Sequence, residues 1–504
     1  MEITKFVEKL REEYQGGLVE KTNNDNNNLN KVVEKEENII KTENTLVYKK
    51  SKELSVLNND IKPLNNEVEE NNTNLDTNAL NKLKIIGITG SKGKSSVAYM
   101  TYLYLKSIGK KVVLYSSIMI VSPKSMKKQY KAIEEAIPNQ DALYEAIVEA
   151  IKDDADYLIL EINENILKSG ITKFVPFNLR VITNINPSNS LDFYSNEEYV
   201  ALKESFFSNI DLEDDCTCIL GFSDGMKRDY FNRLININNK KKVTFGSKWV
   251  CEIRNTDYTN LDYMLFSDNN EKIDSMNGLS FKIRIKDKVE TFYTNLLFPF
   301  NAVNITCLVS ILDTLNVLDV NKLKEMINDI NIEGRNELIR VNNRNIVIGI
   351  SLIPALSYFK EYKENNEINN IITVFGSAGF GFNTWDKKYS NLERLNKIPA
   401  IRSFACNYIS NNCDKVYITS LDPAASNPTE IASELKSLIN NRIENVIEVD
   451  RKKAIYKAIL ESNDNDVIFI SGRGNRNIFC ESQNKISLYT DKEIVLDVIK
   501  SLGW

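Results

Sequence analysis

The sequence predicts an α/β protein whose sheets are mostly parallel. Three observations lead to this fold class. From residue 84 onward, short apolar runs rich in Val and Ile alternate with longer segments of helical periodicity. A glycine-rich turn joins one of these runs to a helical segment. Several of the runs end in polar residues, which is typical of parallel strands whose carboxyl ends border a ligand site.

The glycine-rich turn at 90–96 has the composition of a phosphate-binding loop. It follows the apolar run 84–89 and opens a segment whose apolar residues recur at helical spacing. Its second lysine would reach the β- and γ-phosphates of a nucleotide, and the next hydroxyl would ligate Mg²⁺ at the positive end of the helix. The candidate nucleotide-binding residues in this loop are Gly90, Ser91, Lys92, Gly93, Lys94, Ser95 and Ser96.

The spacing of the loop is G-x-x-G-x-x-G-K-S and departs from the strict G-x-x-x-x-G-K-[ST] pattern. Ile88 occupies the position five residues before Gly93, where the strict pattern has a glycine. An ordinary strand-to-helix turn that happens to hold glycines is therefore the alternative. The lysine, the hydroxyl and the strand–helix context together favour the phosphate-binding loop.

Composition excludes several classes of function. The 504 residues carry a formal net charge of -5 and include no histidine. This excludes His-based acid–base catalysis, Ser-His-Asp and Cys-His nucleophiles, and His-ligated metals. The acidic balance gives no general field for nucleic acid, so we expect no nucleic-acid partner. No apolar stretch has the length of a membrane span and the amino terminus lacks a signal-peptide profile, so we expect a cytoplasmic protein.

Residues 1–83 form an expected amino-terminal extension of low complexity or divergent sequence. Most of this segment is rich in Asn, Glu and Lys and poor in aromatic residues. Such a composition buries too little apolar surface to offset the entropy of ordering. A solvated surface explains its charge runs better than a binding role does.

A central nucleotide-binding domain is expected at 84–333. Two of its predicted strands end in the polar residues Glu161 and Asn184, which would lie at the same sheet edge as the phosphate loop. The predicted elements are strands at 111–115, 155–161 and 179–184, antiparallel strands within 243–293, and helices at 140–151, 302–315 and 320–330.

A second αβ unit, Rossmann-like in its alternation, is expected at 334–504. The glycine-rich turn 376–381 lacks the full dinucleotide fingerprint and an acidic residue at the expected distance, which argues against a nicotinamide site. The predicted elements are strands at 345–350, 371–375, 415–420 and 467–472 and helices at 427–439 and 451–460.

From about residue 84 to the end, the chain resembles the Mur ligase family and looks like a divergent member of it. The loop GITGSKGKSS is similar to the family's GITGTNGKTT, and LILEINENIL places Glu161 where the family has a metal-binding glutamate. Further segments follow in the family's order: ITNINPSNSLDFYSNEEYVALKESFF, FPFNAVN, EGRNE, TSLDPAASNP, DRKKAIYKAI and SGRGNR. The order and spacing of these segments carry the resemblance more than any one of them.

The resemblance implies an ATP- and Mg²⁺-dependent ligase that forms an amide bond through an acyl phosphate. Its partners would be small-molecule carboxylate and amino-acid substrates, with cell-wall enzymes as further partners. The implied catalytic residues are Lys94, Glu161 and Lys203, and the implied metal ligands are Ser95, Glu161 and Lys203 as a carbamate. The implied nucleotide contacts are Asn301, Asn304 and Arg335, and the implied substrate contacts are Asn184, Asp422 and Pro423.

Each of these assignments has a plainer alternative. Without the resemblance, Lys203 would be interpreted as a solvated helix lysine. The two asparagines of FPFNAVN could cap a helix, and Arg335 could be a surface cation.

The departures from the family motifs leave a second function open. The family's Asp-His becomes Ser188-Asn189, its Asp-Tyr-Ala-His becomes 349–352, Ala424 replaces an arginine, and Arg476 replaces the closing glutamate. Losing several ligand groups together could leave little turnover. The alternative is a nucleotide-binding or regulatory paralogue that ligates weakly or not at all. A plain P-loop kinase or ATPase is a third reading, which the carboxy-terminal resemblance weakens.

Overall fold

The chain divides into two units, Met1–Lys82 and Leu83–Trp504. The computed structural model describes residues 82–504 except 125, 128–139, 174, 187–194, 209–215, 224–225, 254–259, 269–271, 380–390 and 483–484. The expected extension at 1–83 therefore lies almost wholly outside the described residues, as does the Ser188-Asn189 departure.

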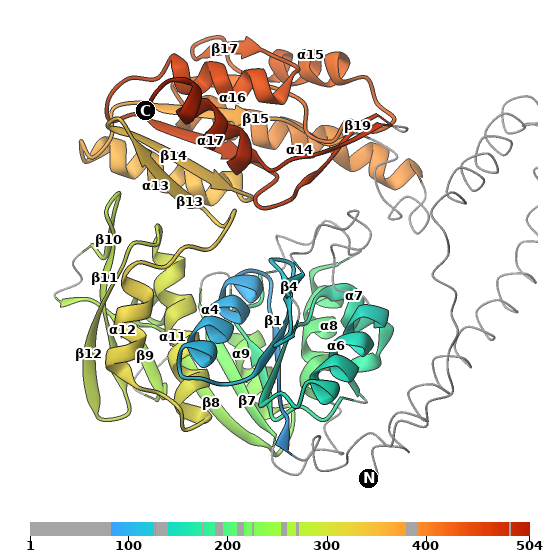
Figure 1. Ribbon diagram of the computed structural model, residues 1–504, viewed down its shortest axis with the longest axis vertical. Coiled ribbons are helices and arrows are strands. Elements are labelled where there is room, and N and C mark those ends of the chain that lie inside the picture. The colour runs from blue at the N-terminus through green and yellow to red at the C-terminus, as the bar shows by residue number, and fades with distance from the viewer. Residues whose placement is uncertain are drawn as a thin grey trace, which may run out of the picture. The chain divides into compact units, whose positions relative to one another are not determined.

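A 12-stranded sheet organises the first part of the larger unit, as expected for a mostly parallel α/β domain (Figure 1). Its parallel centre has the order β8-β7-β6-β1-β5-β2, and the central strands are apolar and buried on both faces, as parallel sheets require. These strands are β1 (Lys84–Thr89), β2 (Val112–Tyr115), β5 (Tyr157–Glu161), β6 (Leu179–Ile182), β7 (Thr217–Phe222) and β8 (Lys241–Ser247).

The strands predicted as antiparallel within 243–293 are only partly so. Antiparallel pairing joins β9 (Tyr263–Phe266), β10 (Asp274–Ser275) and β12 (Lys288–Thr294) to β11 (Gly278–Ile285). The prediction was wrong for β8, which is parallel to both β7 and β9. Short helices, α9 (Arg228–Asn236) and α10 (Lys248–Ile253), follow β7 and β8 and return the chain to the same end of the sheet, and such crossovers produce parallel neighbours.

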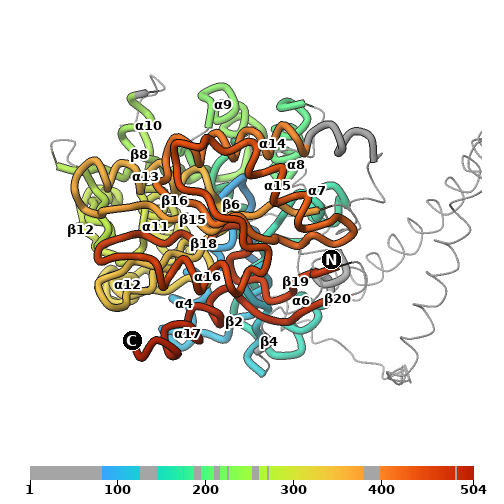
Figure 2. Tube along the Cα trace, turned by 90° about the horizontal axis from the view of Figure 1, so that it is seen from above, coloured from blue at the N-terminus to red at the C-terminus, as the bar shows by residue number. Residues whose placement is uncertain are grey.

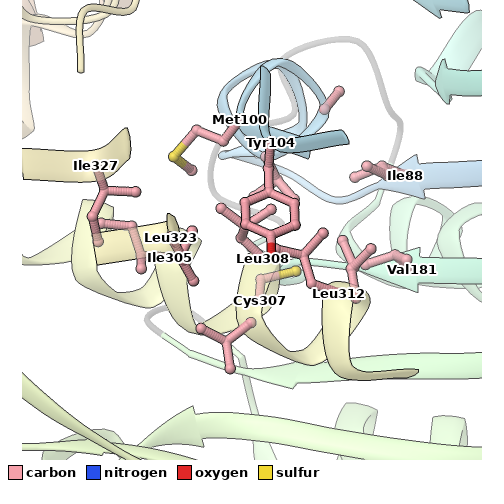
Figure 3. Packing of buried hydrophobic residues seen from close by; sticks show 14 of the residues in the cluster. Ile88, Met100, Tyr104, Val181, Ile305, Cys307, Leu308, Leu312, Leu323 and Ile327 are labelled. Atoms are coloured by element: carbon pink, nitrogen blue, oxygen red, sulfur yellow. The ribbon is translucent and has the colours of Figure 1, made fainter. Parts of the chain in front are cut away.

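The helix after the phosphate loop, α4 (Lys94–Ser107), packs against α11 (Pro299–Thr314) in one apolar core (Figure 3). Tyr104 lies at its centre among Leu308, Leu312 and other labelled side chains, and its hydroxyl donates to the Val317 carbonyl at 2.9 Å. This core packs the loop's helix against β1, the strand that precedes the loop, because Ile86 and Ile88 belong to the same cluster. The other helices of this part are α6 (Gln140–Lys152), α7 (Glu164–Ser169), α8 (Asn196–Ser208) and α12 (Val320–Asn328), and β3 (Ile120–Val121) and β4 (Met126–Lys127) extend the sheet.

A second sheet has the order β13-β14-β18-β15-β16-β17 and is parallel except for β13. Its strands are β13 (Glu337–Val341), β14 (Arg344–Gly349), β15 (Ile371–Phe375), β16 (Lys415–Ile418), β17 (Glu444–Ile447) and β18 (Val467–Ser471). Two buried clusters flank this sheet: one face carries α13 (Leu352–Glu364), α14 (Asn391–Asn412) and α15 (Pro428–Leu438), and the other carries α16 (Arg451–Leu460) and α17 (Asp491–Ser501) (Figure 2). A hairpin of β19 (Ile478–Ser482) and β20 (Lys485–Leu488) completes the unit.

Within the described part of the chain, no helix is both long enough and apolar enough to cross a bilayer.

Candidate functional site

The phosphate loop adopts a backbone that only glycine accommodates at two positions. Gly90 has φ +142° and Gly93 has φ +84°. A Cβ atom would lie 2.0 Å from Thr183 Oγ1 at the first position and 2.4 Å from Asn304 Oδ1 at the second. The loop therefore turns tightly between β6 and α11, and its backbone enters the first turn of α4, where orphan N–H groups attract anions.

Asn184 supports the loop rather than standing apart from it. The backbone carbonyl of Asn184 accepts from Ser91 N at 3.1 Å. Its side-chain amide accepts from Lys92 N and donates to Lys92 O, both at 3.1 Å. The sequence predicted Asn184 as a substrate contact. In the structure, its hydrogen bonds are to the phosphate loop.

Two hydroxyls and one carboxylate meet at the carboxyl ends of β2 and β5. Ser95 Oγ donates to Glu161 Oε1 at 2.9 Å and lies 2.8 Å from Ser117 Oγ. Ser117 N donates to Glu161 Oε2 at 2.8 Å, and Ser117 Oγ lies 3.1 Å from the same oxygen. This set of oxygens suits Mg²⁺, which binds through one or two protein groups plus phosphate oxygens and water. Among the described residues, here or elsewhere, no three His, Cys, Asp or Glu side chains gather as a metal site.

Lys203 is a buried cation beside the phosphate loop and not a solvated helix lysine. Its side chain is 0% exposed, and Nζ lies 2.6 Å from Glu164 Oε1. Nζ also donates to Thr89 Oγ1 and Gly90 O, both at 3.2 Å. Burial lowers the pKa of Lys203 to about 8, against the opposing effect of Glu164.

Lys94 shares two of these partners, Gly90 and Glu164. Its Nζ donates to Gly90 O at 2.8 Å and lies 4.0 Å from Glu164 Oε1. Burial would raise the pKa of Glu164, but Lys94 and Lys203 outweigh it and hold that pKa well below its usual range. The two lysines are therefore held around one ionised carboxylate.

Sequence reasoning missed Glu164, Tyr199 and Ser117. Tyr199 OH lies 2.7 Å from Ser91 Oγ and donates to Glu164 Oε1 at 3.3 Å, while burial raises the pKa of the phenol. Two signals were available in the sequence. Glu164 lies three residues after Glu161, and Tyr199 lies four residues before Lys203, which places the latter two on one face of α8. Ser117 had no such signal, because it follows β2 in an irregular segment.

Asn301 and Asn304 lie on α11. This part of α11 is next to the loop, because a Cβ atom at Gly93 would lie 2.4 Å from Asn304 Oδ1. Asn304 Nδ2 donates to Asn301 Oδ1 at 3.0 Å, and Asn301 Nδ2 donates to Leu297 O at 2.7 Å. Phe298 is the N-cap residue of α11, and no side chain caps the helix there. Neither asparagine therefore acts as the cap. Ser96 is buried in the first turn of α4.

Arg335 connects two parts of the site. Its Nη2 donates to Ser117 Oγ at 3.2 Å, and its Nη1 donates to Asn475 Oδ1 at 2.8 Å. Burial lowers the pKa of this guanidinium, and Glu161 opposes that shift. Arg335 is therefore a half-buried cation beside the Ser117 and Glu161 oxygens rather than a surface cation.

Asp422 and Pro423 lie in the second sheet's domain, after β16. Asp422 is 1% exposed, accepts from Cys480 N at 3.1 Å and lies 3.6 Å from Arg476 Nη1. Within the described residues, no hydrogen bond or ion pair joins Asp422 or Pro423 to the phosphate loop. The departure at 349–352 does border the loop, because Lys92 Nζ donates to Ser351 Oγ at 3.5 Å.

Comparison with known proteins agrees with this arrangement. Two family models match: the Mur ligase middle domain at 88–309 and the Mur ligase, glutamate ligase domain at 351–474. The chain belongs to the Mur ligase family. The resemblance inferred from the motifs and the predicted α/β fold class are thereby confirmed.

Several relatives of this Mur ligase match over most of their length. The UDP-N-acetylmuramoyl-L-alanyl-D-glutamate–2,6-diaminopimelate ligase of Helicobacter pylori is 26% identical over 426 residues, which cover 84% of this chain and 85% of the relative. The UDP-N-acetylmuramyl-tripeptide synthetase of Borreliella burgdorferi is 26% identical over 432 residues, which cover 84% and 77%. A solved MurF ligase from Thermotoga maritima in complex with ADP has a TM-score of 0.54 at 15% identity and covers 84% of this chain and 81% of its own, which shows a shared fold.

Proposed function

We propose that this Mur ligase uses ATP and Mg²⁺ to join a small-molecule carboxylate to an amino acid, through an acyl phosphate, in the synthesis of peptidoglycan precursors. The observation that carries the proposal is the phosphate loop with Lys94 at the start of α4 and the Ser95–Glu161 pair at 2.9 Å beside it. The names of the relatives, which describe UDP-N-acetylmuramoyl-peptide ligases, support the substrate class.

The residues of the site divide the work of phosphoryl transfer. The backbone of 90–96 would cradle the phosphates, Lys94 would leave Gly90 O for the γ-phosphate, and Asn301 and Asn304 would face the nucleotide beside Gly93. Ser95 and Glu161 would hold Mg²⁺, whose charge stabilises the transferring phosphoryl group when it is bound. Ser117 would orient the Glu161 carboxylate by hydrogen bonds to it, and Arg335 would hold Ser117 by donating to its hydroxyl.

The amino-acid substrate would bind in the second domain near Asp422 and Pro423. Ala424 replaces the arginine expected there from the family motif, while Arg476 brings a guanidinium to Asp422 from after β18. A guanidinium pairs well with a substrate carboxylate. We therefore propose an acceptor with a free carboxylate, held by Arg476 in place of the missing arginine.

The test is phosphate release from ATP against UDP-N-acetylmuramyl dipeptide, other glutamyl carboxylates and a panel of amino acids. We expect release that needs both a carboxylate and an amine and is abolished in Lys94→Ala. The matched control is Lys110→Ala, an exposed lysine after the same helix. Release that needs no acceptor would favour a plain ATPase.

The departures from the family motifs favour one competing function. With Arg476 in place of a glutamate and no carboxylate or imidazole at 349–352, a nucleotide-binding partner of other cell-wall enzymes is the second candidate. ADP binding without phosphate release in any combination of the panel would support it and contradict the ligase.

A further inference from the structure

The surroundings of Lys203 do not fit the carbamate that the family resemblance implies. Carbamate formation removes a proton from the ammonium group, joins the neutral amine to CO₂ through a new N–C bond and releases a second proton, so it converts a cation into an anion. Here the amine is 0% exposed and lies 2.6 Å from Glu164 Oε1, whose side chain is 29% exposed. A carbamate at Lys203 would therefore place a second anion next to an ionised carboxylate, at a position that is itself shielded from water, and this is unfavourable.

The remaining contacts of Lys203 also suit a cation. Nζ donates to Thr89 Oγ1 and to Gly90 O, and the Tyr199 ring face lies 5.5 Å from it. A carbonyl oxygen and an aromatic face attract an ammonium group and repel a carboxylate-like group. Each contact thus favours the same charge state.

The charges of the whole site lead to the same result. Lys92, Lys94, Lys203 and Arg335 supply four cations, and Glu161 and Glu164 supply two carboxylates, which leaves an excess of positive charge for a polyphosphate. Modification of Lys203 would make three cations face three anions and remove that excess. A second divalent cation would then be needed to restore it.

We propose that Lys203 remains an unmodified ammonium group and that the Lys203–Glu164 ion pair replaces the carbamate and its second cation. In this arrangement Lys203 is a positioning residue: it holds the Gly90 carbonyl from one side and, through Glu164, keeps Lys94 beside the loop. The proposal concerns the charge state of Lys203. Only its consequence for the number of divalent cations in the site rests on the proposed ligase function.

The direct test is ¹³C NMR of the full chain equilibrated with ¹³C-bicarbonate, with and without Mg²⁺ and ADP. We expect no carbamate carbonyl signal that depends on Lys203. A carbamate signal in the wild-type protein that disappears in Lys203→Arg would overturn the proposal. The NMR signal is measured on the native wild-type protein and needs no turnover. The test therefore gives an answer even if the chain does not ligate.

Chemical rescue of ADP binding gives a second, independent readout. Lys203→Ala should weaken ADP binding about 10-fold or more, as for other groups that orient a binding residue. Added methylammonium should recover part of that loss, whereas formate should not. Recovery by formate and not by methylammonium would show that a carboxylate-like group is required, and would overturn the proposal.

Discussion

Removing the Glu164 carboxylate should destabilise the fold, because it leaves the Lys203 ammonium buried without its counter-charge. Breaking one partner of a buried ion pair generally costs about 3–5 kcal/mol. Lys203 is 0% exposed but Glu164 is 29% exposed, and Gln keeps a hydrogen-bond acceptor, so we expect the low end, about 3 kcal/mol, for Glu164→Gln. The measurement is the free energy of unfolding in urea.

A double-mutant cycle separates the ion pair from other effects of the substitution. In a Lys203→Met background there is no buried cation to leave unpaired, so Glu164→Gln should cost less than about 1 kcal/mol. The control Glu197→Gln removes an exposed partner of Arg233 and should change stability by no more than about 0.5 kcal/mol. A Glu164→Gln cost no larger than that of the control would refute the reasoning.

Four further predictions follow from the site. Stability should rise by about 3 kcal/mol between pH 8 and 10.5 relative to Lys203→Met, because the unfolded chain, with a lysine pKa of 10.5, binds more protons in this window than the folded chain, whose Lys203 pKa is about 8; urea unfolding at several pH values measures it. Ser117→Ala should raise the Mg²⁺ concentration needed for nucleotide binding about 10-fold, because Glu161 loses an orienting hydroxyl, as a Mg²⁺ titration would show. Gly93→Ala should abolish ADP binding in calorimetry, because its Cβ would lie 2.4 Å from Asn304 Oδ1. Arg476→Ala should raise KM for the amino acid about 10-fold or more and leave ADP affinity unchanged, in steady-state kinetics.

The sequence predicted the parallel framework because each central strand is a short apolar run buried on both faces. It predicted the phosphate loop because Gly90 and Gly93 stand where the backbone must be left-handed or tightly packed. The error at β8 had a physical origin: polar residues alternate with apolar ones at 242–245, but crossover helices rather than hairpins connect this strand to its neighbours.

The chemistry around Lys203 could not be predicted from the sequence. Glu164 begins a one-turn helix capped by Asn163, and nothing local indicates that its carboxylate faces a lysine 39 positions later. Tertiary structure supplied that contact, and it changed the interpretation of Lys203 from a modified metal ligand to a buried ammonium group.

The most direct test of the ligase function follows oxygen atoms. The carboxylate that supports phosphate release would be labelled with ¹⁸O, and the released phosphate would be analysed by mass spectrometry. An acyl phosphate that is attacked at carbon by the amine transfers one carboxylate oxygen to phosphate, so we predict one ¹⁸O per phosphate and a matching amide product. Released phosphate without the label would contradict ligation through an acyl phosphate.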